Sequence, residues 1–181
     1  MTTQYVALLR GINVGGNAIV PMTALREALT KQGLSDVQTY IQSGNILFTS
    51  SKADVSALSR LIASTIRAEF AVDAKVVIYS AEQWRAIIAA IPVWWGQNPE
   101  WKYNLLAILA PTTPAEVVEA TGTLKPDIER IEPGPGVVYQ GMSRELFGKT
   151  TTGKLAANPI YKNLTIRNRN TTLKIAALLD D

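Results

Sequence analysis

Near the start of the chain, a glycine-rich segment carries polar side chains that could hold an anion. Its members are Arg10, Gly11, Asn13, Gly15, Gly16 and Asn17. Glycine permits positive φ and brings backbone amides close to a ligand, and arginine pairs well with an oxyanion. The spacing does not match the G-x-G-x-x-G of dinucleotide-binding folds, so we predict an anion contact rather than a dinucleotide site. A loop that needs its glycines only to reverse the chain is the alternative.

A second candidate stands near the other end, where Arg167, Asn168 and Arg169 precede a helix expected at residues 171–179. The N-terminal amides of a helix carry partial positive charge, and an arginine beside them could grip an anion with two hydrogen bonds. Helix capping by Asn168 or Asn170 would explain the asparagines. It does not explain two arginines at an end where the helix dipole disfavours cations, so we predict that they contact a ligand.

Two further polar segments are weaker candidates. Ser43 and Asn45 flank Gly44 in an expected hairpin turn, although the loop after the first strand and this hairpin could lie at different ends of the sheet. Residues 148–155 match G-x-x-x-x-G-K, but Leu155 occupies the place of the Ser or Thr that would bind magnesium. We interpret this second segment as a mobile basic loop rather than a nucleotide site.

The composition excludes several kinds of chemistry. The chain contains no cysteine and no histidine, which rules out disulfides, thiolate metal sites, cysteine nucleophiles and the serine-histidine-acid triad. An enzyme of this composition would depend on Arg, Lys, carboxylate, Tyr or Ser side chains, and no paired carboxylates stand out. We therefore expect no metal and no cofactor, and leave open whether the protein is an enzyme.

The net charge of +3 is unevenly distributed, because residues 146–179 hold six basic side chains and no acidic one. Such a segment can attract small anions or nucleic acid, or it can be an ordinary solvated surface. No apolar run approaches the roughly 18 residues of a membrane span, and no signal peptide opens the chain. We expect a cytoplasmic protein without membrane association, in an oligomeric state that the sequence leaves open.

Hydrophobic periodicity divides the 181 residues into two similar halves. In the first half it predicts strands at 4–9, 37–42, 46–49 and 75–79, and helices at 21–31 and 54–70. This βαββαβ order is typical of ferredoxin-like folds. In the second half it predicts strands at 105–109, 127–132 and 137–142, and helices from 113 and at 171–179. We predict an α+β fold of two ferredoxin-like subdomains packed together, at 1–80 and 105–181, joined by a helix and connector at 81–104.

The connector holds Trp94, Trp95 and Trp101, three of the four tryptophans of the chain. They could fill the seam between the two halves. They could also form a platform on which a ring or a sugar stacks, or a patch that docks a partner protein.

The same segments resemble the bacterial family named domain of unknown function 1697. Residues 5–16, Pro21-Met22 and residues 39–45 carry the resemblance, and residues 165–171 resemble the closing signature of that family. The resemblance implies two ferredoxin-like α+β subdomains and no established activity, so it assigns no catalytic residue. The family usually has tryptophan where this chain has Arg169, and a charge at that position would favour a more anionic ligand.

The leading hypothesis is a protein that binds a small anionic or phosphorylated ligand through the glycine-rich loop and the Arg167 region. Nucleic-acid binding is the alternative, because ferredoxin-like sheets often stack RNA bases on aromatic side chains. The central strands of the first half offer only Tyr5 and Phe48 for that purpose. A protein-interaction module that docks through the tryptophans is the other alternative.

Overall fold

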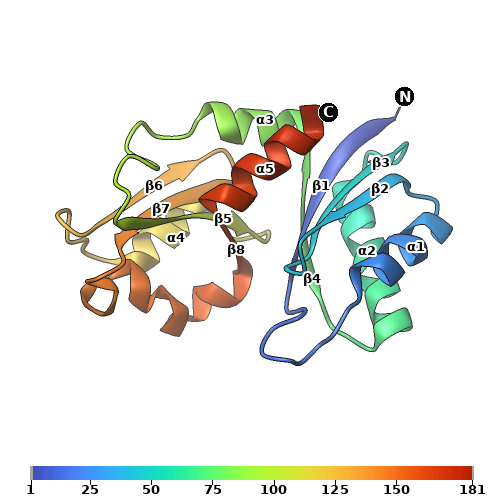
Figure 1. Ribbon diagram of the computed structural model, residues 1–181, viewed down its shortest axis with the longest axis horizontal. Coiled ribbons are helices and arrows are strands. Elements are labelled where there is room, and N and C mark those ends of the chain that lie inside the picture. Colours follow the sequence, from blue (N-terminus) through green and yellow to red (C-terminus); the bar gives the residue numbers. More distant parts are fainter. Residues whose placement is uncertain (1, 181) are drawn as a thin grey trace. The chain divides into compact units, whose positions relative to one another are not determined.

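The structure is a computed structural model that describes residues 2–180. The chain folds into two compact units: the N-terminal unit comprises the described residues up to Trp84 together with those from Ala177 onward, and the C-terminal unit comprises Arg85–Ala176. Within the described residues, each unit contains one four-stranded antiparallel sheet accompanied by helices (Figure 1). This arrangement confirms the expected mixture of helices and antiparallel sheets. No helix in the described part of the chain has the length and apolar character needed to cross a membrane.

The N-terminal unit follows the predicted order of elements. The elements are β1 (Thr3–Arg10), α1 (Met22–Lys31), β2 (Ser35–Tyr40), β3 (Asn45–Ser50), α2 (Val55–Phe70) and β4 (Lys75–Ser80). In the sheet the strands lie in the order β2-β3-β1-β4, so β1 and β3 are central. The helix α3 (Ala81–Ala89) begins directly after β4.

The apolar run in β1 is buried on both faces of the sheet, as its composition predicts. Tyr5, Ala7 and Leu9 pack into one core with residues of α1 and α2, which cover the same face of the sheet (Figure 1). Val6 and Leu8 point to the opposite face and are fully buried as well. Each Å² of apolar surface removed from water stabilises the folded state by about 25 cal/mol. This strand, buried on both faces, is therefore central to the stability of the unit.

The C-terminal unit contains a strand that the sequence did not predict. Its elements are β5 (Trp101–Ile108), α4 (Pro114–Thr121), β6 (Glu129–Gly134), β7 (Val137–Ser143), 3₁₀ segments at Phe147–Lys149, Thr152–Ala157 and Pro159–Asn163, β8 (Leu164–Asn168) and α5 (Arg169–Asp180). The strand order is β6-β7-β5-β8, and the unexpected β8 pairs with the central β5. The hairpin β6–β7 and the capping box of α4, with Thr113 and Glu116, lie where the sequence predicts them.

Gly44 offers a direct test of the tight packing at the end of β1. It has φ +78°, and a Cβ there would lie 2.7 Å from Leu9 Cβ and 2.8 Å from Ile12 Cδ1. Gly44→Ala therefore combines backbone strain with a clash, and we expect it to lower the free energy of unfolding by about 2–3 kcal/mol, measured by chemical denaturation.

The matched control is Gly15→Ala, at a position with φ +59° and no atom within 4 Å of the added Cβ. This variant should lose only about 1 kcal/mol, since it carries the strain without the clash. Equal losses in the two variants would contradict the packing account.

Candidate functional site

The glycine-rich loop and the β2–β3 hairpin lie at the same end of the N-terminal sheet. Asn13, at φ +52°, joins them: its Nδ2 donates to the carbonyl oxygens of Val20 at 3.0 Å and Gln42 at 2.9 Å. Its Oδ1 accepts a hydrogen bond from the Val20 amide at 2.8 Å. The Asn13 side chain therefore holds the loop against the hairpin, and its amide group is used within the fold.

The hairpin residues are likewise used to build the turn. Asn45 is fully buried, and its Nδ2 donates to the Tyr40 carbonyl at 2.9 Å and to Ser43 Oγ at 3.1 Å. The Leu9 amide donates to the Gly44 carbonyl at 2.8 Å, which continues the pairing of β1 with β3 beyond the Leu8–Asn45 pair. Ser43 and Asn45 thus serve the hairpin.

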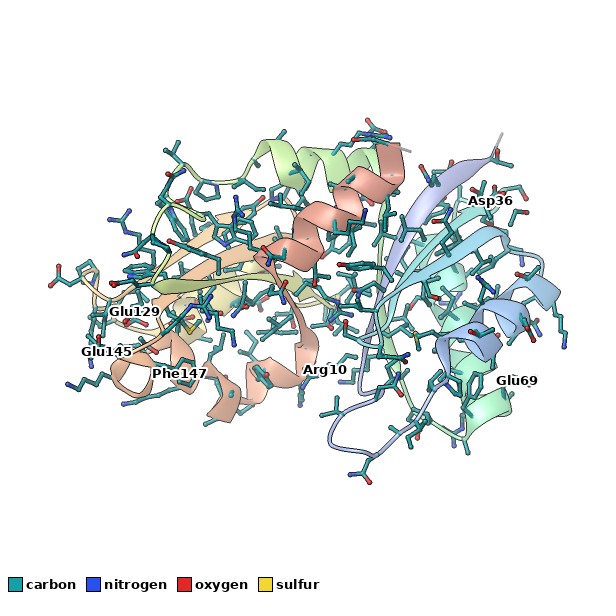
Figure 2. All side chains as sticks on the ribbon, viewed as in Figure 1. Arg10, Asp36, Glu69, Glu129, Glu145 and Phe147 are labelled. Atoms are coloured by element: carbon teal, nitrogen blue, oxygen red, sulfur yellow. The ribbon has the colours of Figure 1, made fainter. Side chains whose placement is uncertain are left out.

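The outer part of the loop is open to solvent. Gly11, Gly15 and Gly16 all have positive φ, as a glycine-dependent backbone requires. Gly15, Gly16 and Asn17 are all exposed. The backbone amide of Asn17 donates to the Val14 carbonyl at 3.0 Å and closes a small turn. Arg10 ends β1 beside this loop and is half-buried (Figure 2).

The start of α5 in the C-terminal unit carries the second predicted group. Asn168 caps the helix, because its Oδ1 accepts a hydrogen bond from the Thr171 amide at 2.8 Å. Arg169 follows, with its guanidinium carbon 6.0 Å from the centroid of the Trp95 ring. This is a cation–π arrangement, in which the guanidinium is attracted to the face of the indole ring. Gly96 allows the approach, since a Cβ at that residue would overlap Arg169 Nε.

A surface hollow of about 360 Å³ opens at this helix start, and we call it the cationic hollow. Its lining is Gly96, Asn98, Pro99, Trp101, Lys102, Tyr103, Arg144, Asn168, Arg169 and Asn170. Within residues 2–180, none of its three cations, Lys102, Arg144 and Arg169, forms an ion pair with a carboxylate. Arg169 Nε is buried and has no hydrogen-bond partner in the described chain. The hollow therefore presents positive charge that the protein itself does not neutralise.

A second hollow, of about 230 Å³, adjoins the first, and we call it the aromatic hollow. Its lining is Trp94, Gln97, Asn98, Trp101, Tyr103 and Arg130. The two hollows share Asn98, Trp101 and Tyr103, so they are contiguous. Trp94 and Trp101 are half-buried, with faces available to solvent, while Tyr103 is buried beneath them.

Arg167 belongs to the interior of the structure and does not line either hollow. It is 6% exposed on β8, and its Nη1 donates to Thr165 Oγ1 at 3.1 Å and to the Ile166 carbonyl at 2.9 Å. Burial lowers the pKa of Arg167 to about 10. Of the predicted group at this end, Asn168 and Arg169 line the cationic hollow.

The aromatic residues named for the alternative hypotheses are partly unavailable for binding. Tyr5 and Phe48 stack on each other with ring centroids 5.4 Å apart inside the N-terminal core, at 3% and 1% exposure. Trp95 is 3% exposed. These three rings cannot stack on a nucleic acid or dock a partner without unfolding, whereas Trp94 and Trp101 can.

The segment 148–155 is closed by a buried carboxylate instead of forming a phosphate cradle. Glu129 (Figure 2), fully buried at the start of β6, accepts hydrogen bonds from the amides of Thr151 at 3.0 Å and Thr152 at 2.7 Å. It also accepts from Thr152 Oγ1 at 2.8 Å and from the Lys125 amide at 2.9 Å. Amides that a P-loop would offer to phosphate are therefore occupied by Glu129. Among residues 2–180, no cluster of three or more carboxylates could hold a metal ion.

Sequence reasoning did not find Lys102, Arg130, Arg144 and Asn98. Each is an ordinary polar residue on its own, and they approach one another only through the pairing of β6, β7 and β5 and the path of the connector. The one available signal was the repeated aromatic and cationic pattern of Trp101-Lys102-Tyr103 next to the tryptophan pair.

Together, the fold and the two hollows define an α+β protein with a cation- and ring-lined surface site in its C-terminal unit. The chain belongs to the family described as protein of unknown function (DUF1697), whose sequence profile matches residues 1–139. The match confirms the resemblance drawn from the sequence; it covers the glycine-rich loop and the connector and ends before β8.

Solved structures extend the comparison to the whole chain. A conserved bacterial protein, SP0830 from Streptococcus pneumoniae, is 31% identical over 99% of this chain and 99% of that chain, with a TM-score of 0.86. An unknown protein from Galdieria sulphuraria aligns at 14% identity over 93% of this chain and 98% of that chain, with a TM-score of 0.28 that is too low to compare folds. No match was found among curated proteins.

Glu129 generates a prediction about stability and pH. Burial by itself would raise the pKa of Glu129, but the hydrogen bonds from Thr152, Thr151 and Lys125 outweigh it and lower the pKa below its ordinary value. Glu129→Gln replaces an acceptor by a group that also donates, and we expect a loss of about 2–3 kcal/mol in the free energy of unfolding at pH 7.

The pH dependence of that loss provides the check. A carboxyl whose pKa is lowered on folding contributes stability above its unfolded pKa, about 4.3, and loses it as the pH falls through the folded pKa. The difference between wild type and Glu129→Gln, measured by urea denaturation, should be constant from pH 8 to pH 6 and shrink below about pH 4. A difference that grows in acid would contradict the assignment.

Proposed function

We propose that the protein binds a small anionic ligand, such as a phosphorylated one, in the cationic hollow of its C-terminal unit. The observation that carries the proposal is the set of three cations around one hollow, Lys102, Arg144 and Arg169, without a carboxylate partner among the described residues. Its volume of about 360 Å³ lies within the range of roughly 300–1,000 Å³ of small-molecule sites.

The groups around the hollow have complementary roles in this proposal. Arg144 and Lys102 are exposed and attract the anion, while Arg169 is half-buried and fixed over Trp95. A guanidinium held in place can form two parallel hydrogen bonds with a phosphate or carboxylate. The start of α5 adds partial positive charge from its first amides next to Asn170. The ligand is therefore held by charge and by fixed donors together.

The glycine-rich loop of the N-terminal unit is retained in the proposal as a separate anion-binding segment, independent of the cationic hollow. Asn13 and Asn45 are used to hold the loop and the hairpin, which leaves Gly15 and Gly16 as the parts with open space around them. Backbone amides in a turn of this kind can donate to an anion.

Calorimetric titration with inorganic pyrophosphate tests the cationic hollow. Arg144→Ala removes an exposed charge that makes no described ion pair, and Arg169→Gln keeps a polar side chain over Trp95. Each change should weaken pyrophosphate binding about tenfold at low salt, since a charge-assisted contact is lost.

The matched control is Lys174→Ala, which removes an exposed charge from the same helix outside the lining of the two hollows. Its affinity for pyrophosphate should stay within about twofold of wild type, because only long-range attraction is lost. Undiminished binding in both arginine variants, or an equal loss in Lys174→Ala, would refute the site.

A further inference from the structure

The aromatic hollow has no role in binding a bare anion, yet its rings are held in fixed positions. Trp94 Nε1 donates to Glu132 Oε2 at 2.9 Å. The Tyr103 hydroxyl accepts a hydrogen bond from the Asn98 amide at 2.9 Å. Rings fixed in this way lose little conformational freedom when a ligand arrives.

The rings form a continuous surface around Tyr103. The centroid of Tyr103 lies 6.4 Å from that of Trp94 and 6.3 Å from that of Trp101, with interplanar angles of 37° and 30°. Gly141 of β7 makes room for this surface, since a Cβ there would lie 2.9 Å from Trp94 Cζ3 and 3.0 Å from Tyr103 Cε1. The backbone is thus built to bring Trp94 close to the sheet.

The size and the lining of the aromatic hollow restrict the kind of ligand that can bind in it. A volume of about 230 Å³ is below the usual range for a whole ligand of roughly 300–1,000 Å³, and it suits one flat ring. Arg130 contributes a cation to its lining, and the cationic hollow adjoins it at the shared residues Asn98, Trp101 and Tyr103. A ligand that filled both hollows would carry a flat ring at one end and a negative group at the other.

Resting on the proposed function, we infer that the ligand is a nucleobase joined to a phosphate: the base stacks in the aromatic hollow and the phosphate lies in the cationic hollow. Every nucleobase can stack on an aromatic side chain, and one such stack raises the affinity of a ligand by roughly 5- to 100-fold. A sugar phosphate would use the cations, but its puckered ring lacks the flat π face with which a base stacks across a half-buried indole. Both a free mononucleotide and a single-stranded nucleic acid supply this chemistry.

The test compares adenosine 5′-monophosphate with ribose 5-phosphate by calorimetric titration of the full chain. The nucleotide should bind at least tenfold more tightly, because only it carries the base. The variants are made at Trp94, which lines the aromatic hollow but not the cationic hollow. Trp94→Leu should reduce that advantage about tenfold and leave pyrophosphate binding unchanged, whereas Trp94→Phe, which retains a ring, should keep most of it. Thermal melts of both variants establish that they are folded.

The outcomes separate the two proposals. If pyrophosphate binds but the nucleotide binds no better than ribose 5-phosphate, the base inference is overturned and the anion site stands. If a tetradeoxyadenylate binds with a steep salt dependence while the mononucleotide does not, the base-and-phosphate chemistry is supported and its source is a nucleic-acid strand. If none of these ligands binds, the inference and the proposed function both fall.

Discussion

The C-terminal site depends on one buried side chain, Trp95. Its indole Nε1 donates to the carbonyl oxygens of Asn104 at 3.3 Å and Gln140 at 3.2 Å, which are paired positions of β5 and β7. Its ring meets Tyr103 and Tyr139 edge-on and carries the guanidinium of Arg169 on a face. This single indole therefore attaches the connector to the sheet and supports the guanidinium of Arg169. Because both hollows are bounded by the connector on one side and β5 on the other, neither would keep its shape without that attachment.

The C-terminal unit has two basic regions, the segment 148–155 and the cationic hollow. They differ in whether the protein itself supplies an anion, and this difference determines where an external anion can bind. In the segment 148–155, the amides that could cradle a phosphate already donate to Glu129, so the protein supplies its own anion. Around the cationic hollow, no carboxylate of the described residues forms an ion pair with Arg144 or Arg169. Positive charges gathered without a counterion repel one another, and an incoming anion relieves that repulsion. The motif that resembles a nucleotide loop is thus structural, while an unremarkable surface offers the binding chemistry.

Much of the N-terminal unit could be predicted from the sequence, because local periodicity and apolar strands determine its elements. The C-terminal unit was harder, since β8 is short, begins with Leu164-Thr165-Ile166 and gains its identity by pairing with β5. That missed strand is also why the burial of Arg167 went unforeseen: a residue expected in a polar lead-in to a helix lies in a sheet. Arg169 could be singled out because a cation conflicts with a simple helix start, and Asn168 because asparagine is a favoured helix cap. The remaining cations are brought together by strand pairing, which no local pattern records.

The central claim is that a base and a phosphate occupy the two adjoining hollows of the C-terminal unit. The most direct measurement is a two-dimensional NMR titration of the ¹⁵N-labelled protein with adenosine 5′-monophosphate, following the indole N–H signals of the four tryptophans. The account predicts that the Trp94 and Trp101 signals shift with the same dissociation constant, while Trp84, which is fully buried, stays in place. Indole signals that all stay in place, with backbone amide shifts in the same spectra restricted to residues 11–17 of the glycine-rich loop or absent, would contradict it.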